Sequence, residues 1–117
     1  MSKAEEYAKV AEEAHQAGIK AGSNHVPEPM HLSYGGKTET ISTGVCGFAW
    51  ILVFPNSQGF ARWATKMGIG SKAYGGGIQI WVGYYGQSME MKLAYAKAYV
   101  EVLQKYGIKS FAESRMD

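Results

Sequence analysis

The ten residues 45–54 (VCGFAWILVF) constrain the fold more than any other stretch of the chain. They include no charged residue, and their β-branched and aromatic side chains are typical of a strand. Successive side chains of a strand face opposite sides, so Ala49 and Ile51 would share one face and Phe48 and Trp50 the other. Because both faces are apolar, the pattern predicts a central strand covered on both sides, the second side by a helix layer or by another subunit.

Patterns on either side of this strand predict an α+β fold. Ser2 and Glu5 match a capping box, and regularly spaced alanines predict a helix that ends near Gly18 or Gly22. The sequence MHLSY-GG-KTETI predicts a hairpin before the strand at 45–54. After that strand we expect a short helix that ends at Gly68, a loop at 68–77 and a strand at 78–85. A helix from Ser88 to Gly107 and a strand at 108–114 complete the expected elements. The expected order is an N-terminal helix, a short hairpin, then β-α-β-α-β, with the helices packed on a small antiparallel or mixed sheet.

Length and composition indicate one domain over residues 1–117. Of these residues 46% are apolar and 19% charged, an ordinary globular composition. We expect 1–22 to be a helix used in oligomer contacts, because its alanine-rich face buries little area per residue and needs a close partner. Residues 23–43 are expected to form a loop and the hairpin, and 44–117 the core.

Charge and cysteine content exclude several classes of protein. The formal net charge of +2 argues against an acidic DNA mimic and gives only weak support to a nucleic-acid binder. A single cysteine cannot form an internal disulfide, which favours a reducing compartment. The charged first residues lack the apolar core of a signal peptide, and no apolar run approaches the roughly 18 residues of a membrane span. We therefore expect an intracellular protein that does not enter a membrane.

Two glycine-rich motifs imitate phosphate-binding loops without their context. The sequence GGKT at 35–38 has His31 where a P-loop needs its first glycine, and strand-like sequence follows it, so a hairpin turn is the better interpretation. The sequence GIGSKA at 68–73 follows a helix rather than a strand, which favours a helix stop and a loop. Lys72 and the backbone N–H groups of that loop could still contact an anion.

The sequence gives little support for a metal site or for a reactive cysteine. His15, His25, His31 and Cys46 match no common spacing of metal ligands, so we expect no metal site. A Cys-His nucleophile would need a partly exposed thiol, whereas Cys46 is expected on an apolar strand face as an inert structural residue. Since no catalytic set stands out, we expect neither an enzyme nor a cofactor.

A cluster of basic and aromatic residues is the remaining candidate site. Cations gather around the predicted second helix and its loop, and aromatic residues lie near that loop or on the next strand. Bases stack on aromatic rings while cations hold phosphates. The alternative is that Trp81 belongs to the core and the tyrosines cover it. The predicted contact residues are Arg62, Lys66, Lys72, Tyr74, Tyr85 and Arg115.

Six further stretches are informative as a set. They are HVPEPM (25–30), GVCGFAW (44–50), FARW (60–63), YGGGIQIWV (74–82), QSMEMKLAYAKA (87–98) and GIKSFAESRMD (107–117). Together they resemble a family of small uncharacterised tailed-phage proteins. The chain departs from that family at Met91 and Lys92, where the family has a charged pair, and in its hairpin, where the family has a longer segment.

The resemblance implies a phage origin and action in the host bacterial cytoplasm, and it carries over no catalytic residue. We expect a non-enzymatic phage accessory protein that acts as a homo-oligomer. It would counter host defence by binding a host or defence protein, or by sequestering a nucleotide-like ligand. The alternatives are a structural or assembly protein of the virion, a nucleic-acid-binding module and an enzyme that uses Cys46.

Overall fold

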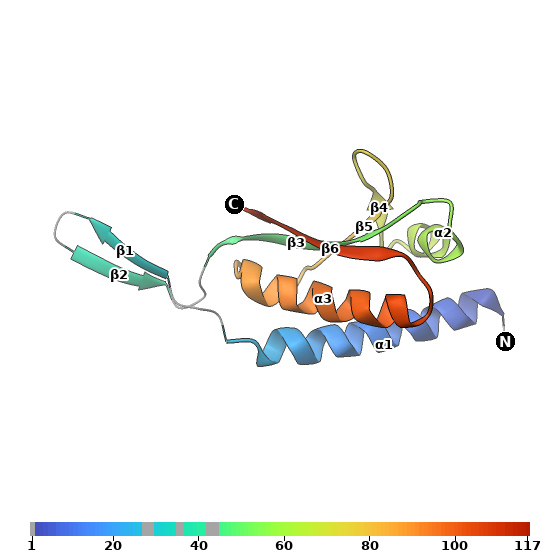
Figure 1. Cartoon of the computed structure of the whole chain (residues 1–117), viewed down its shortest axis with the longest axis horizontal. Helices are drawn as coiled ribbons and strands as arrows, with labels where there is room; N and C mark the ends of the chain where they lie inside the picture. The colour runs from blue at the N-terminus through green and yellow to red at the C-terminus, as the bar shows by residue number, and fades with distance from the viewer. Residues whose placement is uncertain (1, 27–29, 35–36, 42–44) are drawn as a thin grey trace.

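The computed structural model describes residues 2–26, 30–34, 37–41 and 45–117, and it has the expected α+β class (Figure 1). The elements in chain order are α1 (Lys3–Asn24), β1 (Met30–Tyr34), β2 (Lys37–Ile41), β3 (Gly47–Val53), α2 (Gly59–Lys66), β4 (Ser71–Lys72), β5 (Ile78–Trp81), α3 (Met89–Lys105) and β6 (Ser110–Met116). The caps predicted at Ser2 and Ser88 are confirmed, because each hydroxyl accepts a bond from a backbone N–H in the first turn of its helix.

Four strands form one antiparallel sheet in the order β4-β5-β3-β6. The central strand β3 pairs with β5 on one side and with β6 on the other, so Trp50 lies between Trp81 and Glu113. The expected β-α-β-α-β order needs correction, because the segment predicted as a loop contains β4. The order is therefore β-α-β-β-α-β, the split β-α-β arrangement.

The strand predicted at 78–85 is shorter than expected. It ends at Trp81, and the chain then turns toward α3 with Tyr85 and Gly86 both at positive φ. This turn is closed by a bond from the Ser88 N–H to the Tyr85 carbonyl, which brings the chain to the start of α3. Positive φ at two successive residues does not fit a strand, so the extended conformation cannot continue.

The hydrophobic core lies on one face of the sheet, between β3 and the helix pair α1 and α3 (Figure 1). Helix α1 continues to Asn24, beyond the predicted end at Gly18 or Gly22. Both glycines are buried inside the helix, where the rings of Tyr95 and Tyr85 occupy the space that a Cβ would need. The small residues of α1 thus serve close packing within the chain, and the use of this helix in oligomer contacts stays a prediction.

The helix layer that is one of the two predicted covers for the second side of β3 is absent from the described part of the chain, and cover by another subunit stays a prediction. The side chains of β3 alternate strictly between buried and half-buried positions, and no helix of the described part of the chain lies over the second face (Figure 1). Neighbouring side chains on that face are well exposed, with Trp81 at 46% and Phe111 at 45% of their surface. The structure therefore leaves an apolar sheet face open to solvent.

The predicted hairpin is present as a separate two-stranded sheet, with Met30 paired to Ile41 and Tyr34 to Lys37. Gly35 and Gly36, the predicted turn, and Pro27 and Pro29 lie outside the described residues. Figure 1 shows β1 and β2 at the opposite end of the molecule from α2. Within the described ranges, no helix has the length and apolar character that a membrane span requires.

Candidate functional site

The uncovered side of the sheet carries the most distinctive surface of the described chain, and we call it the open face. Alternation along each strand and the register between strands put its residues on one side, opposite the core. The open face consists of Phe48, Trp50 and Leu52 on β3, Gln79 and Trp81 on β5, and Phe111, Glu113 and Arg115 on β6.

Three aromatic rings stand together on the two central strands of the open face. The ring centroids of Trp50 and Trp81 are 4.9 Å apart, and those of Phe48 and Trp81 are 6.2 Å apart with an edge-to-face angle of 88°. The indole N–H of Trp50 donates to the Glu113 carboxylate over 2.8 Å, which holds this ring in place. The result is a fixed aromatic platform with Trp81 as its most exposed member.

Cations lie beside aromatic rings near both ends of β3. At one end the Arg115 guanidinium is 5.8 Å from the centre of the Phe48 ring. At the other end Lys109 lies 5.9 Å from the ring of Phe54, the residue that follows β3. Glu113 is the acidic residue among those that form the open face, and its carboxylate already accepts the Trp50 N–H. The face is therefore suited to a flat, electron-rich group that carries negative charge.

The six predicted contact residues fall into two groups. Arg115 belongs to the open face, and Tyr74 is fully exposed in the tight turn between β4 and β5. Gly77 in this turn lies against Leu52 of the open face. Lys72 lies on the edge strand β4 opposite the core residue Ile78, so its side chain is on the other side of the sheet. Arg115 and Tyr74 therefore lie on or beside the open face, whereas Lys72 does not.

The other three predicted residues lie elsewhere. Arg62 and Lys66 line a shallow hollow beside Tyr7 and Lys3, formed by α1 and α2. Tyr85 packs against α1, where its hydroxyl donates to the Ile19 carbonyl, so its main role is to hold that helix. The structure does not join these residues to the open face.

Cys46 does not lie in the buried core as expected. It precedes β3 in an isolated bridge to Ser88, and its side chain is half-buried. Its carbonyl accepts the N–H of Asp117, which ties the end of β6 to β3. His15 lies on α1 and its ring is bonded to Tyr95, whereas His25 is exposed just after α1. Among the described residues no three His, Cys, Asp or Glu side chains gather closely enough to hold a metal ion.

A hollow of about 410 Å³ lies on the helix side of the sheet and reaches Trp81 of β5, and we call it the tyrosine groove. It lies between α1, α2, β5 and α3, and its walls include Trp63, Trp81 and Tyr84. Trp81 thus belongs both to the platform and to the groove. Glu12 and His15 of α1 add a carboxylate and an imidazole to the lining.

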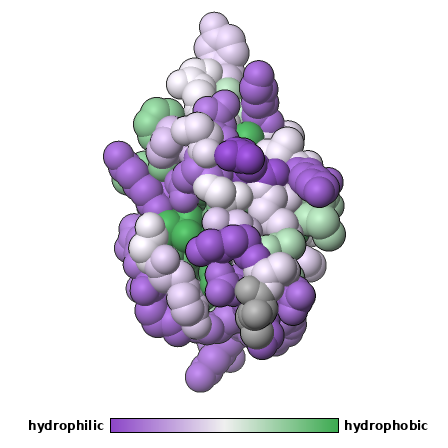
Figure 2. Space-filling model, turned by 90° about the vertical axis from the view of Figure 1, so that its right-hand side faces the viewer, coloured by the Kyte–Doolittle hydropathy of each residue, from purple (hydrophilic) through white to green (hydrophobic). Residues whose placement is uncertain are grey.

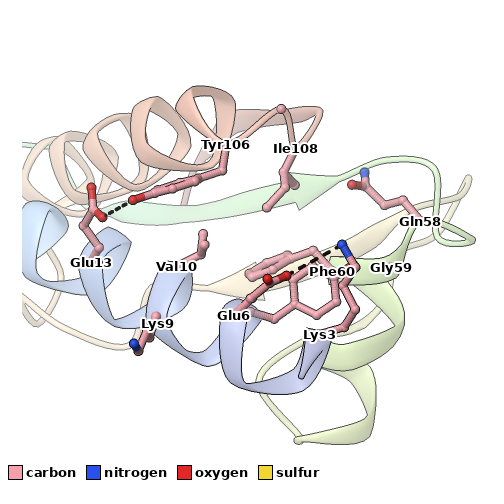
Figure 3. A pocket seen from close by; sticks show the side chains of 12 residues that line it. Lys3, Glu6, Lys9, Val10, Glu13, Gln58, Gly59, Phe60, Tyr106 and Ile108 are labelled. Atoms are coloured by element: carbon pink, nitrogen blue, oxygen red, sulfur yellow. Dashed lines mark hydrogen bonds and ion pairs between the residues drawn. The ribbon is translucent and has the colours of Figure 1, made fainter. Parts of the chain in front are cut away.

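A second hollow of about 650 Å³ lies where the start of α1 meets α2 and the end of α3 (Figure 3). Figure 2 shows that this end of the molecule is mostly hydrophilic, with small hydrophobic areas between polar side chains. The Glu13 carboxylate accepts bonds from Lys105 and Tyr106, and these bonds hold its pKa below the ordinary value of 4.5. Lys3 pairs with Glu6 at 3.6 Å. These paired charges favour a structural role for the second hollow.

Sequence reasoning missed most of the open face, although one signal was present. The sequence pattern leaves Trp81 open as a surface residue, but it predicts a covered side for Phe48 and Trp50. The neighbouring strand carries Phe111, Glu113 and Arg115 at alternate positions, and charged side chains are not expected on a buried sheet face.

Comparison of the chain with protein-family models, curated proteins and solved structures finds no match.

Proposed function

We propose that this protein is a non-enzymatic binding protein whose open face holds the bases of single-stranded nucleic acid. The observation that carries the proposal is the exposed platform of Phe48, Trp50 and Trp81 on the two central strands. Four-stranded sheets with aromatic side chains on an open face bind single strands by stacking bases on those rings. Stacking contributes about 1–3 kcal/mol per base and tolerates any sequence.

The charges around the platform support an anionic ligand. Arg115 and Lys109 can meet phosphates while the rings meet bases, and the Glu113 carboxylate is held by Trp50. A purely apolar partner would gain no electrostatic stabilisation from these cations. The resemblance to small tailed-phage proteins supplies the setting that we propose, an infected bacterial cell in which single strands and nucleotides are abundant.

The experiment is a titration of a fluorescently labelled dT12 strand followed by anisotropy at low salt. Trp81→Ala should raise the Kd about 5- to 150-fold, the equivalent of one lost stacking contact. Tyr106→Ala is the matched control, since Tyr106 is similarly exposed but lies at the far hollow, and it should leave the Kd unchanged. Arg115→Ala should reduce the slope of log Kd against log salt by about 0.7, as expected for one lost phosphate contact.

The competing occupant of the open face is a second copy of this chain. In that case sedimentation would show a dimer that Trp81→Ala dissociates, and dT12 would neither bind nor compete. That combination would refute the proposal. A strand that binds the wild type and Trp81→Ala equally well would also refute it, because the platform would then play no part.

A further inference from the structure

The tyrosine groove lies on the helix side of the sheet and shares Trp81 with the platform on the other side. Its shape follows from the residues of α1. Ala8 and Ala11 line the groove, and their small side chains leave space between α1 and the ring of Trp63. Tyr84 is 46% exposed at its rim, and its ring centroid is 5.5 Å from those of His15 and Tyr95. A volume of about 410 Å³ lies within the range of about 300–1,000 Å³ that is usual for small-molecule sites.

Hydrogen bonding in the groove leaves polar groups for a ligand. The Tyr95 hydroxyl lies 2.6 Å from Nδ1 of His15. Burial raises the pKa of the Tyr95 hydroxyl well above its ordinary value of 10, so the phenol stays protonated and can donate to Nδ1. The other ring nitrogen of His15, Nε2, takes the complementary role: it donates where Nδ1 accepts this bond, and it accepts where Nδ1 donates. Glu12 keeps acceptor capacity, since Gln16 donates to only one of its carboxylate oxygens.

We propose that the tyrosine groove takes one unstacked base, from the end of a strand whose other bases lie on the platform. This inference rests on the proposed function and extends it. Trp81 links the two parts, because it lies beside Trp50 on the open face and also lines the groove. The base enters between aromatic walls and meets Glu12 and His15 with its edge, while its phosphate remains outside. Every base offers both donors and acceptors on that edge, so no sequence preference is implied.

The test uses dT4 strands with the base removed from the first or from the last nucleotide. Because only one end reaches the groove, one abasic strand should bind about tenfold more weakly than the other. Ala8→Leu fills the groove without removing a core residue and should abolish this difference. Ala4→Leu is the matched control, since Ala4 lies one turn away on α1, outside the groove, and it should preserve the difference.

A second substitution tests whether the effect of Ala8→Leu comes from filling the groove or from a local distortion of α1. Tyr84→Ala removes one wall and should also abolish the difference between the two ends, whereas Tyr84→Phe keeps the ring and should retain it. One outcome would refute the groove inference and leave the platform proposal standing. In that outcome dT4 binds the wild type and binds Trp50→Ala more weakly, but the difference in affinity between the two abasic strands is the same in Ala8→Leu and Tyr84→Ala as in the wild type. If dT4 does not bind at all, both proposals fail.

Discussion

Gly18 gives a decisive test of the packing between α1 and α3, because two effects of a substitution there have opposite signs. Alanine is the better helix former, and replacing an interior glycine by alanine should stabilise the helix by about 1 kcal/mol. Tertiary packing opposes this gain. A Cβ on Gly18 would lie 2.6 Å from Cδ2 and 2.7 Å from Cε2 of the Tyr95 ring, much closer than carbon atoms can approach.

The Tyr95 ring has little freedom to give way. It is 5% exposed, its hydroxyl is bonded to His15, and it is surrounded by the rings of Tyr84, Tyr85 and Tyr99. Overpacking in a filled core costs about 1–3 kcal/mol, and a displaced ring would also weaken the bond to His15, which contributes about 1 kcal/mol. These costs exceed the gain in helix propensity, so Gly18→Ala should destabilise the protein by about 1–3 kcal/mol.

Chemical denaturation followed by circular dichroism measures this difference directly. Ala17→Gly is the control, because Ala17 is the neighbouring residue of α1 and should show the propensity effect alone, a loss of about 1 kcal/mol. In a Tyr95→Leu background, where the ring is absent, Gly18→Ala should cost less than in the wild type. If Gly18→Ala stabilises the wild-type protein by about 1 kcal/mol, the placement of Tyr95 against α1 is wrong.

Two further predictions concern charged groups. Glu13 has its pKa lowered by the hydrogen bonds from Lys105 and Tyr106, so its contribution to stability is present above pH 4.5 and is lost as the pH falls through the lowered value. In thermal unfolding, Glu13→Gln should therefore be less stable than the wild type at neutral pH, and the two should converge in acid; a constant difference at every pH would contradict this. Glu113→Gln keeps an acceptor for the Trp50 N–H but removes a negative charge from the open face. It should tighten dT12 binding about 2- to 5-fold at low salt, with the gain disappearing at high salt, and weaker binding would count against an anionic ligand.

Much of the fold could be predicted from local patterns. The Ser88 cap, the alternation in 45–54 and the paired strands of the hairpin each follow from interactions between residues that are close in sequence. By contrast, β4 consists of Ser71 and Lys72 alone, and it is a strand only because β5 lies alongside it. A two-residue strand has no periodicity of its own, so its existence could not be inferred from its residues.

The candidate site was harder to predict because two different situations give the same pattern. A strand with apolar residues on both sides is expected in a covered sheet, but a binding face built of aromatic residues has the same composition. Only the charges on the neighbouring strand distinguish the two, and that requires knowing which strands pair. The packing of Tyr85 against Gly22 could not be predicted either, because it joins residues that are far apart in the chain.

The strict alternation along β3 divides its residues between two separate tasks. Ala49, Ile51 and Val53 are completely buried and hold the sheet to its helices, whereas Phe48, Trp50 and Leu52 point to solvent. Mutations at the first set would be removed by selection for folding, while mutations at the second would mainly alter what the protein binds. A few substitutions on the exposed side of this one strand could therefore change which ligand the protein binds, while every intermediate variant still folds.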